Sequence, residues 1–231
     1  MPKKNILRGA IFIITVFIPI SVFSDVLQEY RNTVNILEKI HDDKTGEYIM
    51  YSECSQKAYS EGYPRLGYLF YALASSESIN AGNFRELLTD LGIQVKEATK
   101  PKIKSSDTKT NLKVAIDMEL REIDKIYPVF IKRLNSEYNK EAIRSIKYAG
   151  EVDRQHLGIL HAGHSFIALV SSTFMKKIEE TSIKYFVCQI CGSTVIELPR
   201  MICPICSSPV SSYKEVAKTE HFYMLYDKNN R

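Results

Sequence analysis

The sequence predicts a mainly α protein, in which a four-helix bundle is followed by a small C-terminal β module that binds metal. Apolar residues recur at helical spacing over most of residues 25–180, which indicates long amphipathic helices. Four cysteines crowd into the segment from Cys188 to Cys206, which indicates a compact metal site. A chain of 231 residues is long enough for one such bundle and one small module.

The composition is that of an ordinary globular protein, with 45% apolar and 25% charged residues. The net charge is +4, and Lys3, Lys4 and Arg8 at the start of the chain supply three of the positive charges. The remainder of the chain is therefore close to neutral. We expect no nucleic-acid partner, because such binding needs a basic surface.

Residues 1–24 have the pattern of a secretory signal peptide. The positive residues at the start are followed by an apolar run from Gly9 to Val22, and cleavage after Ser24 would leave Asp25 as the mature N-terminus. The apolar run is short for a membrane span. We expect an exported, periplasmic or otherwise extracytoplasmic protein, which would touch a membrane only through an uncleaved leader.

The bundle is predicted for residues 25–180. The first helical pattern pauses at Thr45–Gly46 and ends at the turn before Pro64, where the second helix begins, since proline favours a first helical turn. A polar stretch at residues 93–108 then forms a long connection.

The third helix is predicted from Asn111 to Leu134, with a kink at Pro128, and the fourth from Lys140 toward Glu180. Four helices with one long connection after the second describe a ferritin-like bundle.

Bundles of this kind bind metal through carboxylates and histidines on facing helices, and residues three apart share a helical face. Each of the four predicted helices offers at least one such residue. The candidate ligands are Glu47, Glu77, Glu119, Glu122, Asp153 and His156. Cys54 is expected to be a buried, inert thiol, and His161 and His164 are expected to be surface or packing residues.

The module is predicted for residues 184–216, with a tail at 217–231 to which no chemistry is assigned. It contains two Cys-x-x-Cys turns, formed by Cys188 with Cys191 and by Cys203 with Cys206. Four thiolates in a tetrahedron suit zinc or a single iron. Two disulfides are the alternative in an exported protein. The residues Tyr-Phe-Val that begin at Tyr185 are expected to form a strand that covers the site.

Over residues 34–216 the chain resembles the rubrerythrin family. The resemblance rests on Glu-Gly-Tyr-Pro at 61–64, Leu-Phe-x-Ala-x-Ala-x-x-Glu ending at Glu77, Glu-x-x-Glu followed by Tyr127-Pro, and Tyr-Ala-x-Glu-Val-x-x-x-His ending at His156. The module is similar to the rubredoxin-like domain of that family, although Ser207 stands where glycine is usual.

The resemblance implies a diiron centre with seven catalytic or supporting residues. The implied ligands are Glu77, Glu119, Glu122, Asp153 and His156, and the supporting residues are Tyr51 and Tyr127. The chain departs from the family at three ligand positions. Lys44 occupies the position of the family's first-helix glutamate. Asn80 occupies the position of a histidine, and Asp153 that of a glutamate. Glu47 lies one turn from Lys44 and replaces the missing glutamate only if the helix slides.

The implied function is reduction of hydrogen peroxide at the diiron centre, fed by iron in the four-cysteine site. It further implies an NAD(P)H-linked peroxidase of oxidative-stress defence, with a separate electron donor, working as a homodimer. Two alternatives stay open. The departures favour a non-enzymatic scaffold with a structural four-cysteine zinc site, whereas an iron-storage role would not need the module.

Overall fold

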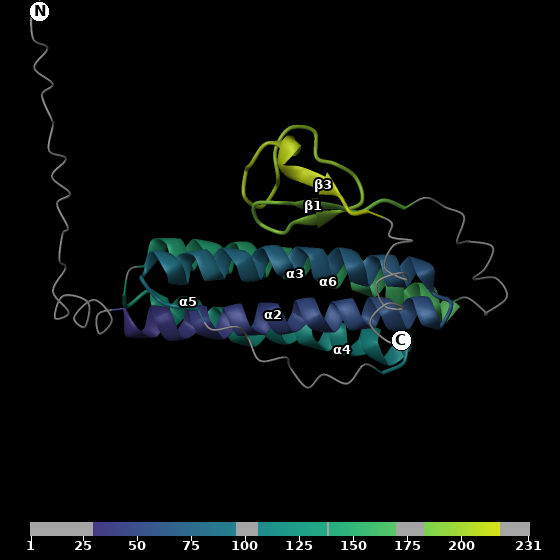
Figure 1. The fold of residues 1–231 in the computed structure, drawn as a ribbon, viewed down its shortest axis with the longest axis horizontal. Coiled ribbons are helices and arrows are strands. Elements are labelled where there is room, and N and C mark those ends of the chain that lie inside the picture. The colour runs from purple at the N-terminus through teal and green to yellow at the C-terminus, as the bar shows by residue number, and fades with distance from the viewer. Residues whose placement is uncertain (1–29, 96–105, 138, 170–182, 218–231) are drawn as a thin grey trace, which may run out of the picture.

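The computed structural model describes residues 30–95, 106–137, 139–169 and 183–217 (Figure 1). The predicted leader and all but the first residue of the predicted tail lie outside these ranges. Four helical segments form a bundle, and a small sheet module with the cysteines lies against one side of it. Within the described ranges, no helix combines the length and the apolar character needed to cross a membrane.

Helices α2 (Arg31–Ser60) and α3 (Pro64–Asp90) form the first antiparallel pair (Figure 1). The tight turn between them uses Gly62, whose φ of +81° suits glycine. α2 runs unbroken through Gly46, where the sequence pattern pauses. Gly46 is buried, so packing in the bundle outweighs its low helix propensity.

The third segment consists of α4 (Thr108–Arg121), the π-helical turn η1 (Glu122–Ile126) and α5 (Tyr127–Leu134). α4 begins before the predicted Asn111, because the side chain of Asp107 caps it. The kink expected at Pro128 takes the form of the π turn, in which the Tyr127 N–H donates to the Glu122 carbonyl. The wider turn accommodates the proline ring, which would clash in a regular α-helix.

Helix α6 (Lys140–Leu169) completes the bundle. Asn139 precedes it and accepts a hydrogen bond from the Ala142 N–H at 3.0 Å. The predicted extension of this helix toward Glu180 lies outside the described residues.

The bundle core has a polar layer between two apolar clusters. One cluster includes Leu69, Leu112 and Leu160, and the other includes Phe84 and Ile146. The buried polar residues of the central layer are Lys44, Glu47, Glu77, Asn80, Glu119, Glu122, Asp153 and His156. Burying so many charges is costly unless each has a partner, so this layer is where a function is expected.

The module contains strands β1 (Phe186–Cys188), β2 (Thr194–Val195) and β3 (Tyr213–Glu215), with the turn η2 (Val210–Ser212) before β3. The strand order is β2-β1-β3, and both pairings are antiparallel. β1 begins one residue after the predicted Tyr185.

The module docks on α3 and α6 of its own chain through hydrogen bonds (Figure 1). Near one end, the Tyr68 hydroxyl donates to the Val216 carbonyl at 2.6 Å. Near the other, the Asn83 amide donates to the Ile190 carbonyl at 2.9 Å. The second of these bonds holds the first cysteine turn, which contains Ile190, against α3.

Candidate metal centres

Four cysteine sulfurs converge in the module, and all lie within 4.8 Å of one another. The Sγ–Sγ distances are 3.8 Å between Cys188 and Cys206 and 3.6 Å between Cys191 and Cys203. Sulfurs placed tetrahedrally at about 2.3 Å from a metal would be about 3.8 Å apart. The cluster therefore fits one iron or zinc ion. The four cysteines are free thiols in the structure, not the two disulfides of the alternative.

Both cysteine turns contain a residue with left-handed backbone. The N–H of Gly192, at φ +80°, donates to the Cys188 carbonyl, and the N–H of Ser207, at φ +61°, donates to the Cys203 carbonyl. Ser207 thus adopts the conformation for which glycine is usual. The hydrogen bond with Cys191 lowers the pKa of the Cys188 thiol to about 5 and raises the pKa of Cys191, so the pair shares one proton and one thiolate before metal binds.

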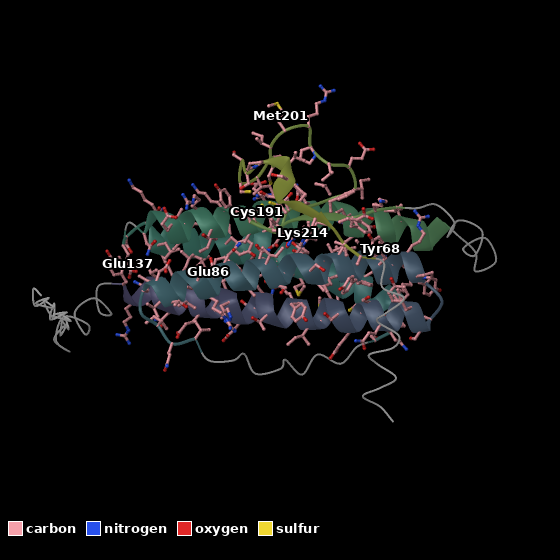
Figure 2. The ribbon with its side chains drawn as sticks, turned by 45° about the horizontal axis from the view of Figure 1, so that its top comes forward. Tyr68, Glu86, Glu137, Cys191, Met201 and Lys214 are labelled. Carbon is pink, nitrogen blue, oxygen red and sulfur yellow. The ribbon has the colours of Figure 1, made fainter. Side chains whose placement is uncertain are left out.

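The cysteine turn that contains Cys191 faces the bundle. Figure 2 shows Cys191 on the bundle side of the module and Met201 at its outer tip, where Met201 is 77% exposed. The Ser76 hydroxyl of α3 donates to the Gly192 carbonyl at 2.5 Å. Gly192, which follows the candidate ligand Cys191, is therefore hydrogen-bonded to Ser76, which precedes Glu77.

In the bundle, three helical segments bring together four of the predicted ligands. Ligand atoms of Glu77, Glu119, Asp153 and His156 lie within 4.8 Å of one another, and each residue is at most 1% exposed. This is a carboxylate–histidine site of the diiron type. Cation binding would offset the cost of burying these carboxylates.

Lys44 of α2 fills one half of this layer with its ammonium group. Its Nζ lies 2.7 Å from Glu47, 2.9 Å from Glu122, 3.0 Å from both Asp153 oxygens and 3.3 Å from Glu77. Burial opposes the charge on the amine, but the carboxylates, above all Asp153 and Glu122, outweigh it and hold the Lys44 pKa well above its ordinary value. The predicted ligands Glu47 and Glu122 thus bind an ammonium here.

His156 defines the other half of the layer. Its Nδ1 lies 3.0 Å from Glu77 Oε1 and 3.3 Å from Glu119 Oε1, and its Nε2 lies 3.0 Å from Ser76 Oγ. Because Ser76 donates its one hydrogen to Gly192, it can only accept from the histidine. Nε2 therefore carries a hydrogen in either charge state, and Nδ1 is the nitrogen where a proton or a metal binds.

The charge state of His156 without metal follows from the same contacts. Burial lowers the pKa of the imidazole, but hydrogen bonds with Glu119 and Glu77 more than compensate and raise it to about 10. A metal at Nδ1 would displace this proton. Among the described residues, the buried side-chain oxygens that accept no hydrogen bond of good geometry are Glu77 Oε1 and Glu119 Oε2, and Glu77 Oε1 is instead ion-paired with His156.

Two buried tyrosines support the carboxylates, as the resemblance implies. The Tyr51 hydroxyl donates to Glu119 Oε1 at 2.7 Å. The Tyr127 hydroxyl donates to Asp153 Oδ2 at 2.6 Å and lies 2.9 Å from Glu122 Oε2. These bonds fix the rotamers of groups that would otherwise repel one another.

The residues present do not fit two metal ions. Lys44 places an ammonium where the resemblance puts a carboxylate ligand, and Asn80 places an amide where it puts a histidine. The Asn80 Nδ2 points to Glu77 Oε2 at 3.3 Å, so it acts as a donor that orients Glu77. The residues around His156, in contrast, offer free ligand atoms for one ion.

The other predicted residues lie outside both centres. Cys54 is buried, and burial raises the pKa of its thiol to about 12, which keeps it unreactive. His161 is exposed and His164 is half-buried. The sequence pattern missed Ser76, because its partner Gly192 is distant in the chain.

Comparison with known proteins points to one family. A family model described as Rubrerythrin matches residues 44–163. Rubrerythrin-2 of Clostridium acetobutylicum is 27% identical over 175 residues, which cover 75% of this chain and 91% of the relative.

Two solved structures show the fold. Nigerythrin in its fully reduced, all-ferrous state has a TM-score of 0.67 at 24% identity, covering 80% of this chain and 86% of its own. Desulfovibrio desulfuricans bacterioferritin, described with a diiron site in different catalytic states, has a TM-score of 0.61 at 19% identity, covering 66% of this chain and 90% of its own. The predicted fold class, a ferritin-like bundle with a small cysteine module, is confirmed.

Proposed function

Because the chain belongs to the rubrerythrin family, we propose that it is a non-haem iron oxidoreductase that reduces hydrogen peroxide to water. The observation that carries the proposal is the contact between its two candidate metal centres. Gly192, next to the ligand Cys191, is joined through Ser76 to His156 by two successive hydrogen bonds. A one-electron thiolate centre would thus lie beside the carboxylate–histidine centre of the same chain.

Ferrous iron at either centre supplies one electron on oxidation, and reduction of hydrogen peroxide to two waters takes two electrons and two protons. The chain keeps the bundle centre dry, because its carboxylates and His156 are at most 4% exposed. The hydroxyl hydrogens of Tyr51 and Tyr127 lie at Glu119 and Asp153, where they hold protons beside the reaction site.

Substitution of Glu119 by glutamine tests the proposal. Glu119→Gln keeps the shape but removes the charge, so peroxide turnover with a reductant should fall by about 100-fold or more. The thiolate-to-iron absorption of the module should stay the same. Glu86→Gln, at an exposed position of α3, is the matched control and should keep full turnover (Figure 2). Full turnover in Glu119→Gln would contradict the proposal.

One observation favours a second candidate, a non-enzymatic scaffold with a structural zinc site. Lys44 already neutralises part of the carboxylate charge that iron would otherwise neutralise. Metal analysis of the purified chain separates the two functions. One zinc and no iron would support the scaffold, whereas iron in both centres would support the peroxidase.

We further propose that electrons come from NAD(P)H through a separate redox protein and that the chain forms a homodimer. The docked module gives each chain both centres, so a dimer is not needed to bring them together. Light scattering after size exclusion should give twice the chain mass. A single-chain mass with full turnover would show that transfer occurs within one chain.

We also propose that the mature protein acts outside the cytoplasm, where it would remove peroxide under oxidative stress. The support is the leader pattern of residues 1–24. N-terminal sequencing of protein from fractionated cells should find Asp25 as the first residue. Protein that begins at Met1 in the membrane fraction would indicate an uncleaved anchor.

A further inference from the structure

We propose that the bundle binds one metal ion, in the half of the polar layer that contains His156, and that the Lys44 ammonium takes the place of a second ion. The inference deepens the proposed function and rests on its premise that the bundle is a metal centre. Compared with the diiron centre that the resemblance implies, the bundle would hold one ion instead of two. That ion would lie in the His156 half and would be bound by the residues of that half.

Lys44 excludes an ion from its own half by occupying the point where the carboxylates converge. Its Nζ has contacts of 2.7–3.3 Å with Glu47, Glu122, Asp153 and Glu77. These side chains come from four helical segments, and Lys44 is 0% exposed. A metal bound by the same oxygens would need the space that Nζ occupies.

The His156 half differs, because the cation between its carboxylates is a proton on His156 Nδ1, which a metal ion can displace. Glu119 Oε2 has no hydrogen-bond partner, and Glu77 Oε1 is paired only with His156, in side chains that are at most 1% exposed. Ser76 fixes the hydrogen of His156 on Nε2, so that Nδ1 faces these oxygens. Nitrogen and carboxylate atoms that converge in this way form a cation site.

The two carboxylate oxygens of Glu77 lie in different halves of the polar layer. Oε2 lies 3.3 Å from both Lys44 Nζ and Asn80 Nδ2, whereas Oε1 lies 3.0 Å from His156 Nδ1. One carboxylate thus contacts the ammonium on one side and would offer its other oxygen to the proposed ion. The remaining ligands would be Glu119 and His156, with Asp153 inside the same group of atoms.

Metal counting on the full chain tests the inference. The chain is loaded with ferrous iron without oxygen, desalted and analysed by mass spectrometry for metals, and the thiolate-to-iron absorption gives the share in the module. We expect one ion in the module and one in the bundle. Lys44→Glu should bind two in the bundle, because it removes the ammonium and supplies a carboxylate.

Lys39→Glu is the matched control, since it makes the same charge change on α2 at a side chain that is 59% exposed. It should leave one ion in the bundle. Two ions in the bundle of the unsubstituted chain would overturn the inference but not the proposed function. No ion in the bundle would overturn both. Lys44→Glu that stays at one ion would refute the role of Lys44.

A second pair of variants locates the ion even if Lys44→Glu does not fold. Glu119→Gln should lose the bundle ion, because it removes a ligand of the His156 half. Glu47→Gln should keep it, because Glu47 contacts Lys44 and is not in the ligand group. Loss of the ion in Glu47→Gln, or its retention in Glu119→Gln, would place the metal elsewhere and refute the inference.

Discussion

At the scale of single residues, the Tyr127 hydroxyl contacts two carboxylates of the polar layer. It donates to Asp153 Oδ2 and lies beside Glu122 Oε2, and Tyr127 is only 4% exposed. Tyr127→Phe removes a hydrogen bond to a charged acceptor without changing the shape. The free energy of unfolding should fall by about 1.5–3 kcal/mol.

Urea denaturation measures this loss. Tyr48→Phe is the control, because Tyr48 is 43% exposed and its substitution should change stability by less than about 0.5 kcal/mol. If both variants unfold at the same urea concentration, the hydroxyl does not stabilise the layer.

Four of the residues that form the bundle site were predictable from the sequence. Helical spacing and family resemblance selected Glu77, Glu119, Asp153 and His156, and the structure places these four together. The sequence placed Lys44 at a ligand position, but the full set of carboxylates around its ammonium, up to 109 positions away, is set by the packing of the helices. Ser76 gave no signal for the same reason, since a hydroxyl gains its role only when Gly192 docks beside it.

At the scale of the helix, two starts are capped by acids from other turns. Glu137, at the end of the bundle where α2 begins, accepts from the Thr33 N–H at 2.8 Å and from the Thr33 hydroxyl at 2.7 Å (Figure 2). Glu61 accepts from the Thr108 N–H at 2.8 Å and from its hydroxyl at 2.6 Å. Each carboxylate satisfies N–H groups that a helix start leaves free, and each joins a turn to the start of a helix distant in the chain.

Glu137→Gln should lower the free energy of unfolding by about 1 kcal/mol at pH 7. Partial burial opposes the charge of Glu137, but hydrogen bonds from Thr33 outweigh it and lower the pKa of the carboxyl in the folded state. The folded pKa is thus below the unfolded value of about 4.3. The stabilisation is present above that pH and disappears as the pH falls through the folded pKa.

Urea denaturation at a series of pH values checks the sign of this effect. The difference between the unsubstituted chain and Glu137→Gln should shrink toward acidic pH, whereas Glu86→Gln should match the unsubstituted chain throughout. A difference that does not change with pH would show that the charge of Glu137 is not what caps α2.

Element boundaries were predictable where they depend on local chemistry. Pro64 starts α3 as expected, because a proline acts on its own turn. The π turn η1 was expected only as a kink at Pro128, since the choice between a bend and a wider turn depends on packing against α6. The cap of α2 by Glu137 was also hidden, because it joins residues 104 positions apart.

At the scale of the whole molecule, the docking of the module depends on the absence of a side chain at Gly192. A Cβ there would lie 2.9 Å from the Ser76 hydroxyl and 3.1 Å from the Ser76 carbonyl. Backbone strain alone is tolerated, because Ser207 adopts a φ of +61° in the other cysteine turn. Gly192→Ala should therefore push the module away from α3, mainly through the contact with Ser76.

Hydrogen exchange of the α3 amides, read by mass spectrometry, would detect this separation as faster exchange around Ser76. The thiolate-to-metal absorption should persist, which would show that the module itself remains folded. Gly82→Ala is the matched control, because a Cβ at Gly82 meets nothing within 4 Å. Equal exchange in both variants would mean that Gly192 does not control docking.

The sequence predicted both parts of the molecule but not their contact. Metal-ligand spacing identifies a module from its own residues, whereas the docking bonds of Tyr68 and Asn83 follow no periodic pattern. The resemblance implied a homodimer, and the structure brings the two candidate centres of one chain together.

Lys44 has a consequence for how the protein meets its surroundings. A bound ion can be exchanged for a competing metal whenever the competitor is more abundant or binds more tightly. An amine that belongs to the polypeptide cannot be exchanged, chelated or replaced by the wrong element. Part of the cationic charge of this centre is therefore fixed at translation, and it remains the same whether iron is plentiful or scarce.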